Sequence, residues 1–345
     1  MEKPTQYART SDEVKIAFTT KGTGTPYLEM PPIPFGHGAG PAEIAEWQTW
    51  DAEISRRGTL VMYDCRGTGM SDRDVTDFSL DGWVRDIEAV ADALRLETFV
   101  IFAPDSLAVP TAIAYATQHP GRVSHLVLWQ AHPHIKHLLG QPGFATVLEL
   151  IDRDWKLFSE VLVQLMEGFL DPETAQKEAA MMRELHTPHG LKAAFQAAKD
   201  IDVTDLLPQV TTQTLVLHRR EGRQELSESM TVASGIPGAG LTIVEGSAFG
   251  WALQHPEEVL QAIDEFVGWN NAPEKVIGDG NLSPRELEVL GLLVMGRSAR
   301  EIGAELVLGT RTVERHISNI YRKIGAHNRA QATAFALDNG LTERP

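Results

Sequence analysis

The sequence contains a single cysteine, Cys65, among its 345 residues. One thiol excludes a disulfide framework and any metal site built from several cysteines, and it is typical of proteins kept in a reducing compartment. No apolar run approaches the roughly 18 residues of a membrane span, and residues 1–13 lack the apolar core of a signal peptide. We therefore expect a cytoplasmic protein that does not contact membranes and needs no metal or cofactor.

Positive charge is scarce over most of the chain. The net charge is −16, yet residues 282–345 hold nine basic and seven acidic residues, so the negative charge belongs to the part before them. An acidic body repels a polyanion, whereas the final segment can approach one. A stretch rich in Gly, Pro and Asn, without apolar periodicity, separates the two. The sequence predicts a first domain at 1–269, a linker at 270–281 and a second domain at 282–345.

Apolar runs typical of β-strands recur through the first domain and alternate with helical periodicity. They are Val14–Thr19, Pro26–Met30, Thr59–Tyr63, Thr98–Phe102, Val123–Trp129, Thr214–His218 and Leu241–Val244. This rhythm predicts an α/β fold with a doubly wound, mostly parallel sheet. Helical patterning across residues 130–208 interrupts it, and we interpret this long insertion as a helical lid over a pocket.

Ser106 lies at the corner between the strand that ends near Phe102 and an apolar helix that follows. A strand that turns sharply into a helix at a lone serine is the layout of a nucleophile elbow. The usual G-x-S-x-G glycines are missing, because Pro104 and Ala108 stand in their places. The question is then whether the serine retains catalytic partners.

Two segments make the first domain similar to a known family. Residues 63–72, YDCRGTGMSD, resemble the D-x-R-G-x-G-x-S loop of α/β-hydrolases, and residues 114–120, AYATQHP, resemble the helix after their elbow. The resemblance covers residues 8–268 and implies an acid after strand 214–218 and a histidine after strand 241–244. This chain has Gly222 and Phe249 at those positions. A serine without an imidazole base is a poor nucleophile, so we expect no hydrolase activity.

What remains is a lidded pocket suited to a small, largely apolar organic ligand. The candidate ligand-binding residues are Ser106, Asp105, His37, Phe249, Trp251, Trp129, Trp155 and Phe158. Two alternatives stay open. Glu221, Asp105 or a histidine (His37, His132, His134, His218 or His255) could replace the missing groups in an active serine hydrolase, or the domain could be a ligand-free scaffold for dimerisation.

The second domain carries signals for four short helices. Residues 283–286 and 298–301 are capping boxes, a third helix spans 310–324, and Asn328 caps a fourth. The third helix has one apolar stripe, formed by Val313, Ile317, Ile320 and Ile324. The opposite face carries cations and short polar groups, as a helix in a DNA major groove requires: Arg311, Arg315, Ser318, Asn319 and Arg322.

This segment resembles the LuxR-type DNA-binding domain throughout, in residues 282–290 (LSPRELEVL), 296–302 (GRSAREI), 312–325 (TVERHISNIYRKIG) and 328–332 (NRAQA). The resemblance implies that Arg311, Thr312 and Lys323 contact phosphates, that Glu314, Arg315 and Ser318 face bases, and that helix 329–338 pairs two copies. Gly309 stands where the family commonly has a serine cap.

Together the two domains predict a transcription regulator whose degenerate hydrolase-like domain binds a small molecule and modulates DNA binding. No receiver-domain pattern precedes the linker, which favours a small-molecule signal over phosphorylation. Two-fold pairing predicts a homodimer on a palindromic operator in double-stranded DNA.

Overall fold

The computed structural model describes residues 4–32, 45–104, 107–136, 142–167, 172–222, 224–248, 250–269, 282, 284–306, 308–324, 326 and 328–338. The chain divides into two compact units, residues 1–267 and residues 268–345. The predicted linker at 270–281 lies outside the described residues. Among the helices that are described, none is long and apolar enough to cross a bilayer.

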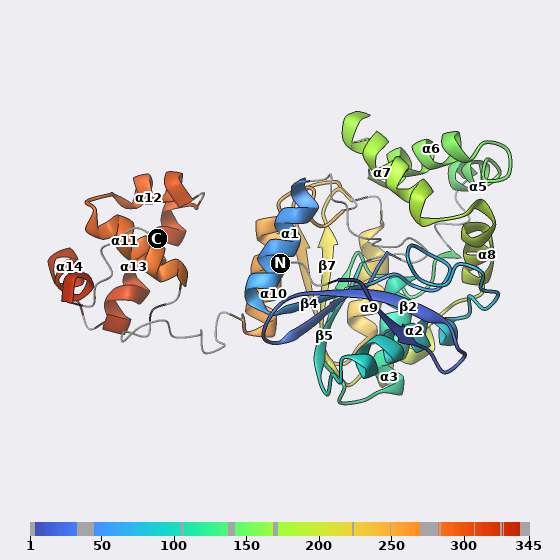
Figure 1. The fold of residues 1–345 in the computed structure, drawn as a ribbon, viewed down its shortest axis with the longest axis horizontal. Helices are drawn as coiled ribbons and strands as arrows, with labels where there is room; N and C mark the ends of the chain where they lie inside the picture. The colour runs from blue at the N-terminus through green and yellow to red at the C-terminus, as the bar shows by residue number, and fades with distance from the viewer. Residues whose placement is uncertain are drawn as a thin grey trace. The chain divides into compact units, whose positions relative to one another are not determined.

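The first unit is built on an eight-stranded sheet of order β1-β2-β4-β3-β5-β6-β7-β8 (Figure 1). The pairs β1–β2 and β2–β4 are antiparallel, and every later pair is parallel. The α/β expectation is thereby confirmed. The strands are β1 (Gln6–Arg9), β2 (Lys15–Gly22), β3 (Pro26–Glu29), β4 (Thr59–Tyr63), β5 (Phe99–Pro104), β6 (Val123–Trp129), β7 (Gln213–Arg219) and β8 (Gly240–Val244).

Burial explains why the strands could be found in the sequence. All six residues of β5 are buried, as expected for a strand covered on both faces, which reads as a continuous apolar run. Strand β1 was not predicted, because it is a four-residue edge strand in which Ala8 alone is buried.

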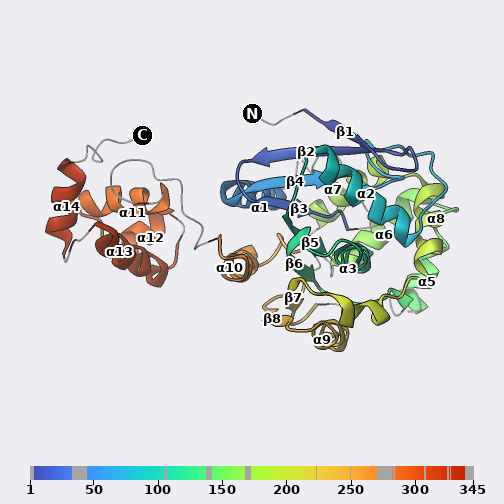
Figure 2. The ribbon, with the colours of Figure 1, turned by 90° about the horizontal axis from the view of Figure 1, so that it is seen from below.

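Helices cover both faces of the sheet (Figure 2). One face carries α1 (Ala45–Arg57) and α10 (Pro256–Val267), and the other carries α2 (Leu80–Ala93), α3 (Ala108–Gln118) and α9 (Leu226–Gly235). Arg57 joins the first two helices, since its Nε and Nη2 donate to the Asp264 carboxylate at 2.6 and 2.8 Å. The hydrophobic core lies between the sheet and α2, α3 and α9.

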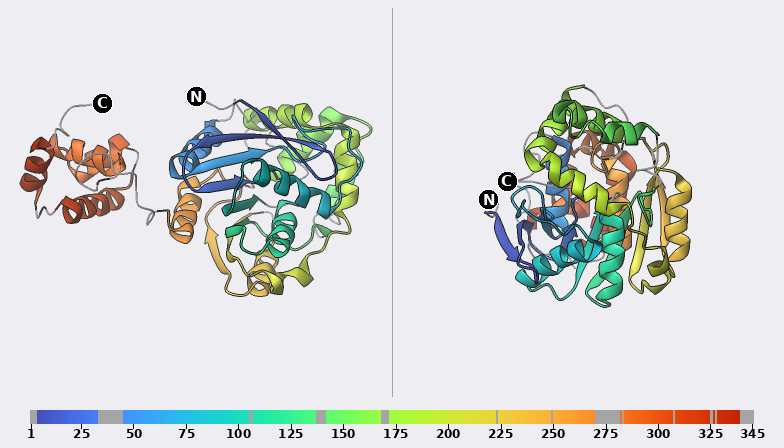
Figure 3. Two further views of the ribbon diagram at one scale, coloured as in Figure 1. Left: turned by 60° about the horizontal axis from the view of Figure 1, so that its bottom comes forward. Right: turned by 90° about the vertical axis from the view of Figure 1, so that its right-hand side faces the viewer.

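The insertion after β6 forms the helical lid. Its helices are α5 (Pro142–Leu148), α6 (Trp155–Glu167), α7 (Pro172–Leu185) and α8 (Pro188–Ala198), and they gather on one side of the first unit (Figure 3). The lid has a hydrophobic core of its own. It is also held to the loop after β4, because Gly69 N donates to Leu185 O at 2.8 Å and Arg73 Nη2 donates to Glu184 O at 2.6 Å.

The second unit contains α11 (Pro284–Val294), α12 (Ala299–Leu306), α13 (Thr310–Ile324) and α14 (Arg329–Asp338) around a small apolar core. The second capping box is confirmed, because Ser298 N donates to the Glu301 carboxylate at 2.8 Å and Glu301 N donates to Ser298 Oγ at 3.3 Å. Asn328 caps α14 through a 3.0 Å bond from Gln331 N. Ser283, of the first box, lies outside the described residues.

The turn between α12 and α13 depends on a close backbone approach. Leu308 N donates to Gly303 O at 2.8 Å, and a Cβ added at Gly303 would lie 2.6 Å from Leu308 O. Only glycine therefore fits without displacing the turn that joins the two helices of the helix-turn-helix.

Candidate ligand pocket and DNA interface

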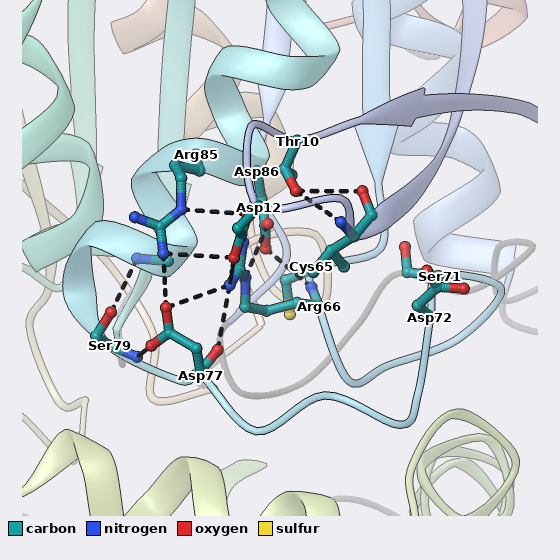
Figure 4. Close-up of polar contacts among 12 residues, drawn as sticks. Thr10, Asp12, Cys65, Arg66, Ser71, Asp72, Asp77, Ser79, Arg85 and Asp86 are labelled. Atoms are coloured by element: carbon teal, nitrogen blue, oxygen red, sulfur yellow. Dashed lines mark hydrogen bonds and ion pairs between the residues drawn. The ribbon is translucent and has the colours of Figure 1, made fainter.

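The loop after β4, which carries the hydrolase-like motif, is held by a network of ion pairs around the buried Arg66 (Figure 4). The Arg66 side chain is fully buried and forms ion pairs with Asp12 at 2.8 Å and Asp86 at 3.0 Å. Hydrogen bonding to Arg66 holds the pKa of Asp12 well below its usual range. In the same loop, Ser71 Oγ donates to Asp64 O and accepts from Ala17 N. These contacts hold the loop in place, so the motif has a structural role here.

The strand and the helix that flank the predicted nucleophile elbow are both present. Strand β5 ends at Pro104 and α3 begins at Ala108, which leaves three residues for the turn. Thr111 Oγ1 donates to Leu107 O at 2.6 Å in the first turn of α3. Asp105 and Ser106 themselves lie outside the described residues, as do the predicted site residues His37 and Phe249.

At the position expected for the catalytic acid, the structure holds a glycine packed against an amide. Gly222 N donates to Arg219 O at 3.1 Å. A Cβ added at Gly222 would lie 2.6 Å from Gln130 Oε1. Gln130 directly follows β6, and its side chain therefore lies against the place where a side chain at 222 would begin. Sequence reasoning did not single out Gln130, because a lone polar residue after a buried strand carries no distinctive signal.

The loop that carries the expected base position is tied down by two side chains. The fully buried Arg219 guanidinium donates to Glu245 O at 2.6 Å, Ala248 O at 3.3 Å and Gly250 O at 3.4 Å. Gln254 Oε1 accepts from two further backbone N–H groups of this loop, those of residues 247 and 248. These bonds anchor the backbone of the described residues on either side of position 249. The two side chains that form them follow apolar strands and carry no motif, so the sequence did not reveal them.

Of the histidines and acids considered as substitutes, His37 and Asp105 lie outside the described residues, and the others have the following surroundings. His218 Nδ1 is 3.0 Å from Ser229 Oγ on α9, in the buried interior. His132 Nδ1 lies 3.3 Å from both Gln130 O and Gln224 Nε2. Glu221 is exposed. The His255 side chain is half exposed beside Glu257, and His134 forms an isolated β-bridge with Asp202.

The predicted aromatic ligand contacts separate into different places. Trp251 packs edge-to-face on Phe102, with ring centroids 5.2 Å apart, and Trp129 lies under the Arg219 guanidinium at 5.0 Å. Phe158 is fully buried in the hydrophobic core of the lid, and its predicted contact with a ligand stays a prediction. Trp155 stacks on Phe158 and lines a cleft of about 510 Å³ on the lid.

A buried acid lies among aromatic rings on the α1 face of the sheet. Glu29, at the end of β3, accepts a 2.7 Å hydrogen bond from Trp50 Nε1. Burial raises the pKa of Glu29 to about 8. The side chain is therefore largely protonated at neutral pH. Within the part of the chain described, no three His, Cys, Asp or Glu side chains converge in a way that could hold a metal ion.

In the second unit, the α13 side chains that the structure describes lie on the two faces that the sequence predicts, while the side chains of Arg322 and Ile324 lie outside that description. Val313 and Ile320 are fully buried, and Ile317 packs against the same core. The opposite face is open: the exposed residues are Arg311, Glu314, Arg315, Ser318 and Lys323, and Thr312 and Asn319 are half-buried. Lys323 Nζ also donates to the Glu286 carboxylate on α11 at 2.7 Å. The face can present cations and polar groups to a DNA groove.

Comparisons with known proteins agree with this division. Residues 280–336 match the family of bacterial regulatory proteins described as the luxR family. Transcriptional regulatory protein MctR of Rhizobium johnstonii is 26% identical over 193 residues, which cover 45% of this chain and 90% of that protein. Spore germination protein GerE of Bacillus subtilis is 42% identical over 62 residues, which cover 18% of this chain and 84% of that protein.

The first unit has its likeness among solved hydrolases. The esterase EaEST from Exiguobacterium antarcticum superposes with a TM-score of 0.67 at 20% identity, covering 76% of this chain and 99% of that one. At this identity the likeness establishes the fold and leaves the chemistry open. The chain belongs to the LuxR family of bacterial regulatory proteins, with a DNA-binding helix-turn-helix domain in its C-terminal part and an α/β-hydrolase-like domain before it.

Proposed function

We propose that this protein is a transcription regulator whose hydrolase-like domain binds a small, largely apolar organic ligand and thereby changes operator binding. The observation that carries the proposal is the replacement of the acid by Gly222, which has no side chain to orient a base. With Phe249 at the base position, Ser106 has neither partner of a triad. A hydrolase fold that has lost these groups retains a lidded site suited to binding.

The clamped loop supports the same reading. Arg219 and Gln254 hold the base-bearing loop through backbone hydrogen bonds. A fixed loop and a lid held to the loop after β4 form a preorganised site, and preorganisation favours binding. A ligand shifts DNA binding only if its affinity differs between the DNA-competent and the incompetent arrangement of the protein. Closure of the lid would supply that difference by altering how two hydrolase-like domains pair in a homodimer.

The test follows melting temperature and ester hydrolysis together in a library of apolar compounds and generic esters. A ligand at 100 times its Kd stabilises by about 2.7 kcal/mol, which a melting curve resolves. Stabilisation without turnover supports the proposal. Turnover that disappears in Ser106→Ala contradicts the proposal and favours an active hydrolase. If no compound raises the melting temperature and no ester is hydrolysed, a dimerisation scaffold is favoured.

Arg315→Ala tests the DNA-binding half of the proposal. Arg315 is exposed on α13, and we expect its loss to weaken operator binding by about tenfold or more, since a good base contact contributes about 1–3 kcal/mol. Arg297→Ala is the matched control, because Arg297 is exposed but lies outside α13. Gel shifts on a palindromic site selected from random DNA give both affinities. Equal losses in the two variants would show only a general charge effect.

A further inference from the structure

Gln130 stands out among the buried polar residues of the first unit. Its side chain is fully buried, and among the residues that the structure describes neither Oε1 nor Nε2 has a hydrogen-bond partner. A buried amide that loses its bonds to water without replacing them destabilises the fold, so such groups need an explanation. The amide could instead have been an apolar group of the same size, which would pack there at no such cost.

The backbone of Gln130 is also strained. Its φ is +48°, in the left-handed region that a residue with a long side chain rarely adopts. The conformation is held by the 2.7 Å bond from Gln130 N to Leu217 O on the neighbouring strand. Strain of this kind persists where the surrounding structure enforces it, and it concentrates at functional sites.

The place of Gln130 in the fold points to a ligand. It lies directly after β6, at the carboxyl edge of the parallel strands, where open α/β sheets bind their ligands. The lid begins from this same edge. Gly222, in the turn after the neighbouring β7, contributes no side chain here, and Gln130 Oε1 lies 2.6 Å from the position that a Cβ at 222 would take.

We propose that Gln130 is the polar anchor of the ligand site and selects a ligand with a carboxamide or lactam group. An amide side chain offers one acceptor and one donor side by side, so its complement is a group that offers a donor and an acceptor with the same spacing. A carboxamide pairs with both atoms at once. An ester or ketone provides only an acceptor and leaves Gln130 Oε1 without a donor.

This inference rests on the proposed ligand-binding function and is tested with benzamide and acetophenone, which have the same shape but differ in the amide NH₂. Melting temperature and ligand-observed NMR are measured for the full chain, for Gln130→Leu and for Gln213→Leu. The last is the control, since Gln213 is an exposed glutamine at the opposite end of the same sheet.

We expect benzamide to bind the wild type and the control. The affinity for benzamide should fall about tenfold or more in Gln130→Leu, and the wild type should bind acetophenone about tenfold or more weakly than benzamide. We also expect Gln130→Leu without ligand to melt at or above the wild-type temperature, because no protein hydrogen bond is lost. A lower melting temperature would assign Gln130 a structural role. Benzamide binding that is absent, or that survives Gln130→Leu, would overturn the inference.

The outcome for regulation is separate. If benzamide binds through Gln130 but operator affinity does not change with any bound compound, the anchor stands and the regulatory proposal fails. If a compound changes operator affinity and binds equally well to Gln130→Leu, the regulatory proposal stands and the anchor fails.

Discussion

At the position of the missing acid, the amide of Gln130 and the bare backbone of Gly222 depend on each other. A Cβ at 222 would meet Gln130 Oε1 at 2.6 Å, well inside contact distance. We expect Gly222→Ala to lower the free energy of unfolding by about 1–3 kcal/mol through overpacking. In a Gln130→Ala background the same change should cost much less. Urea unfolding of the four proteins measures this coupling, and additive losses would contradict the contact.

The buried Glu29 should make stability depend on pH. Its pKa is about 8 in the folded protein and 4.5 in the unfolded chain, so its favourable contribution is full below pH 4.5 and is lost as the pH rises through 8. Glu29→Gln keeps an acceptor for Trp50 Nε1 and removes the titration.

We therefore expect the stability of Glu29→Gln, relative to wild type, to increase by about 3–4 kcal/mol between pH 5 and pH 8, since each pKa unit is worth about 1.4 kcal/mol. Melting curves across that range measure the difference. The exposed Glu265→Gln controls for loss of charge. His186, whose pKa burial lowers to about 3, acts in the opposite direction but is common to all three proteins. A constant difference across the range would argue against a protonated Glu29.

For single residues, the sequence pattern cannot predict the environment of a side chain when the same spacing occurs in two environments. Phe158 occupies an apolar position on an amphipathic helix, and the same spacing fits a lid core or a pocket wall. Gln130 is set apart by its backbone conformation and its missing partners, neither of which a single sequence displays. That Gly222 occupies the expected position of the acid stays a prediction, which the resemblance to the hydrolases made possible.

At the scale of elements, the α12–α13 turn offers a sharp comparison between two glycines. Gly303→Ala would place a Cβ 2.6 Å from Leu308 O, whereas Gly291, inside α11, has nothing within 4 Å of an added Cβ. We expect Gly303→Ala to destabilise the second unit by about 1–3 kcal/mol. Gly291→Ala should stabilise it by about 0.5–1 kcal/mol, because alanine favours helix. Melting curves followed by circular dichroism measure the stability of both variants. Equal changes in stability would contradict the close approach at the turn.

Strands and helices with strong periodicity were predictable from the chain alone. The strands Thr59–Tyr63 and Val123–Trp129 and the helices from 310–324 and 329–338 have the predicted bounds. Their apolar positions pack into the hydrophobic core of the unit to which each belongs, so the pattern predicts the fold. Helix α8 was not identified separately, because it lies inside a long insertion where helical signals follow one another with only short interruptions.

For the whole molecule, the division into two units predicts two unfolding events. Each unit has its own hydrophobic core. Ile320→Ala, at a fully buried position of the second unit, should lower the temperature of only one calorimetric transition. The free energy of unfolding of that unit should fall by about 2–5 kcal/mol. A ligand that binds the first unit should raise the temperature of the other transition. A single transition that shifts as a whole would show that the two cores unfold together.

Cys65 provides a chemical probe of local opening in the first unit. It is the only sulfhydryl in the sequence, it is buried beneath the charged loop, and burial raises the pKa of its thiol well above the usual range. Because the reactive species is the thiolate, alkylating reagents should modify the protein only when this loop opens to solvent. The rate of alkylation then reports openings of the hydrolase-like unit and is blind to the helices that bind DNA.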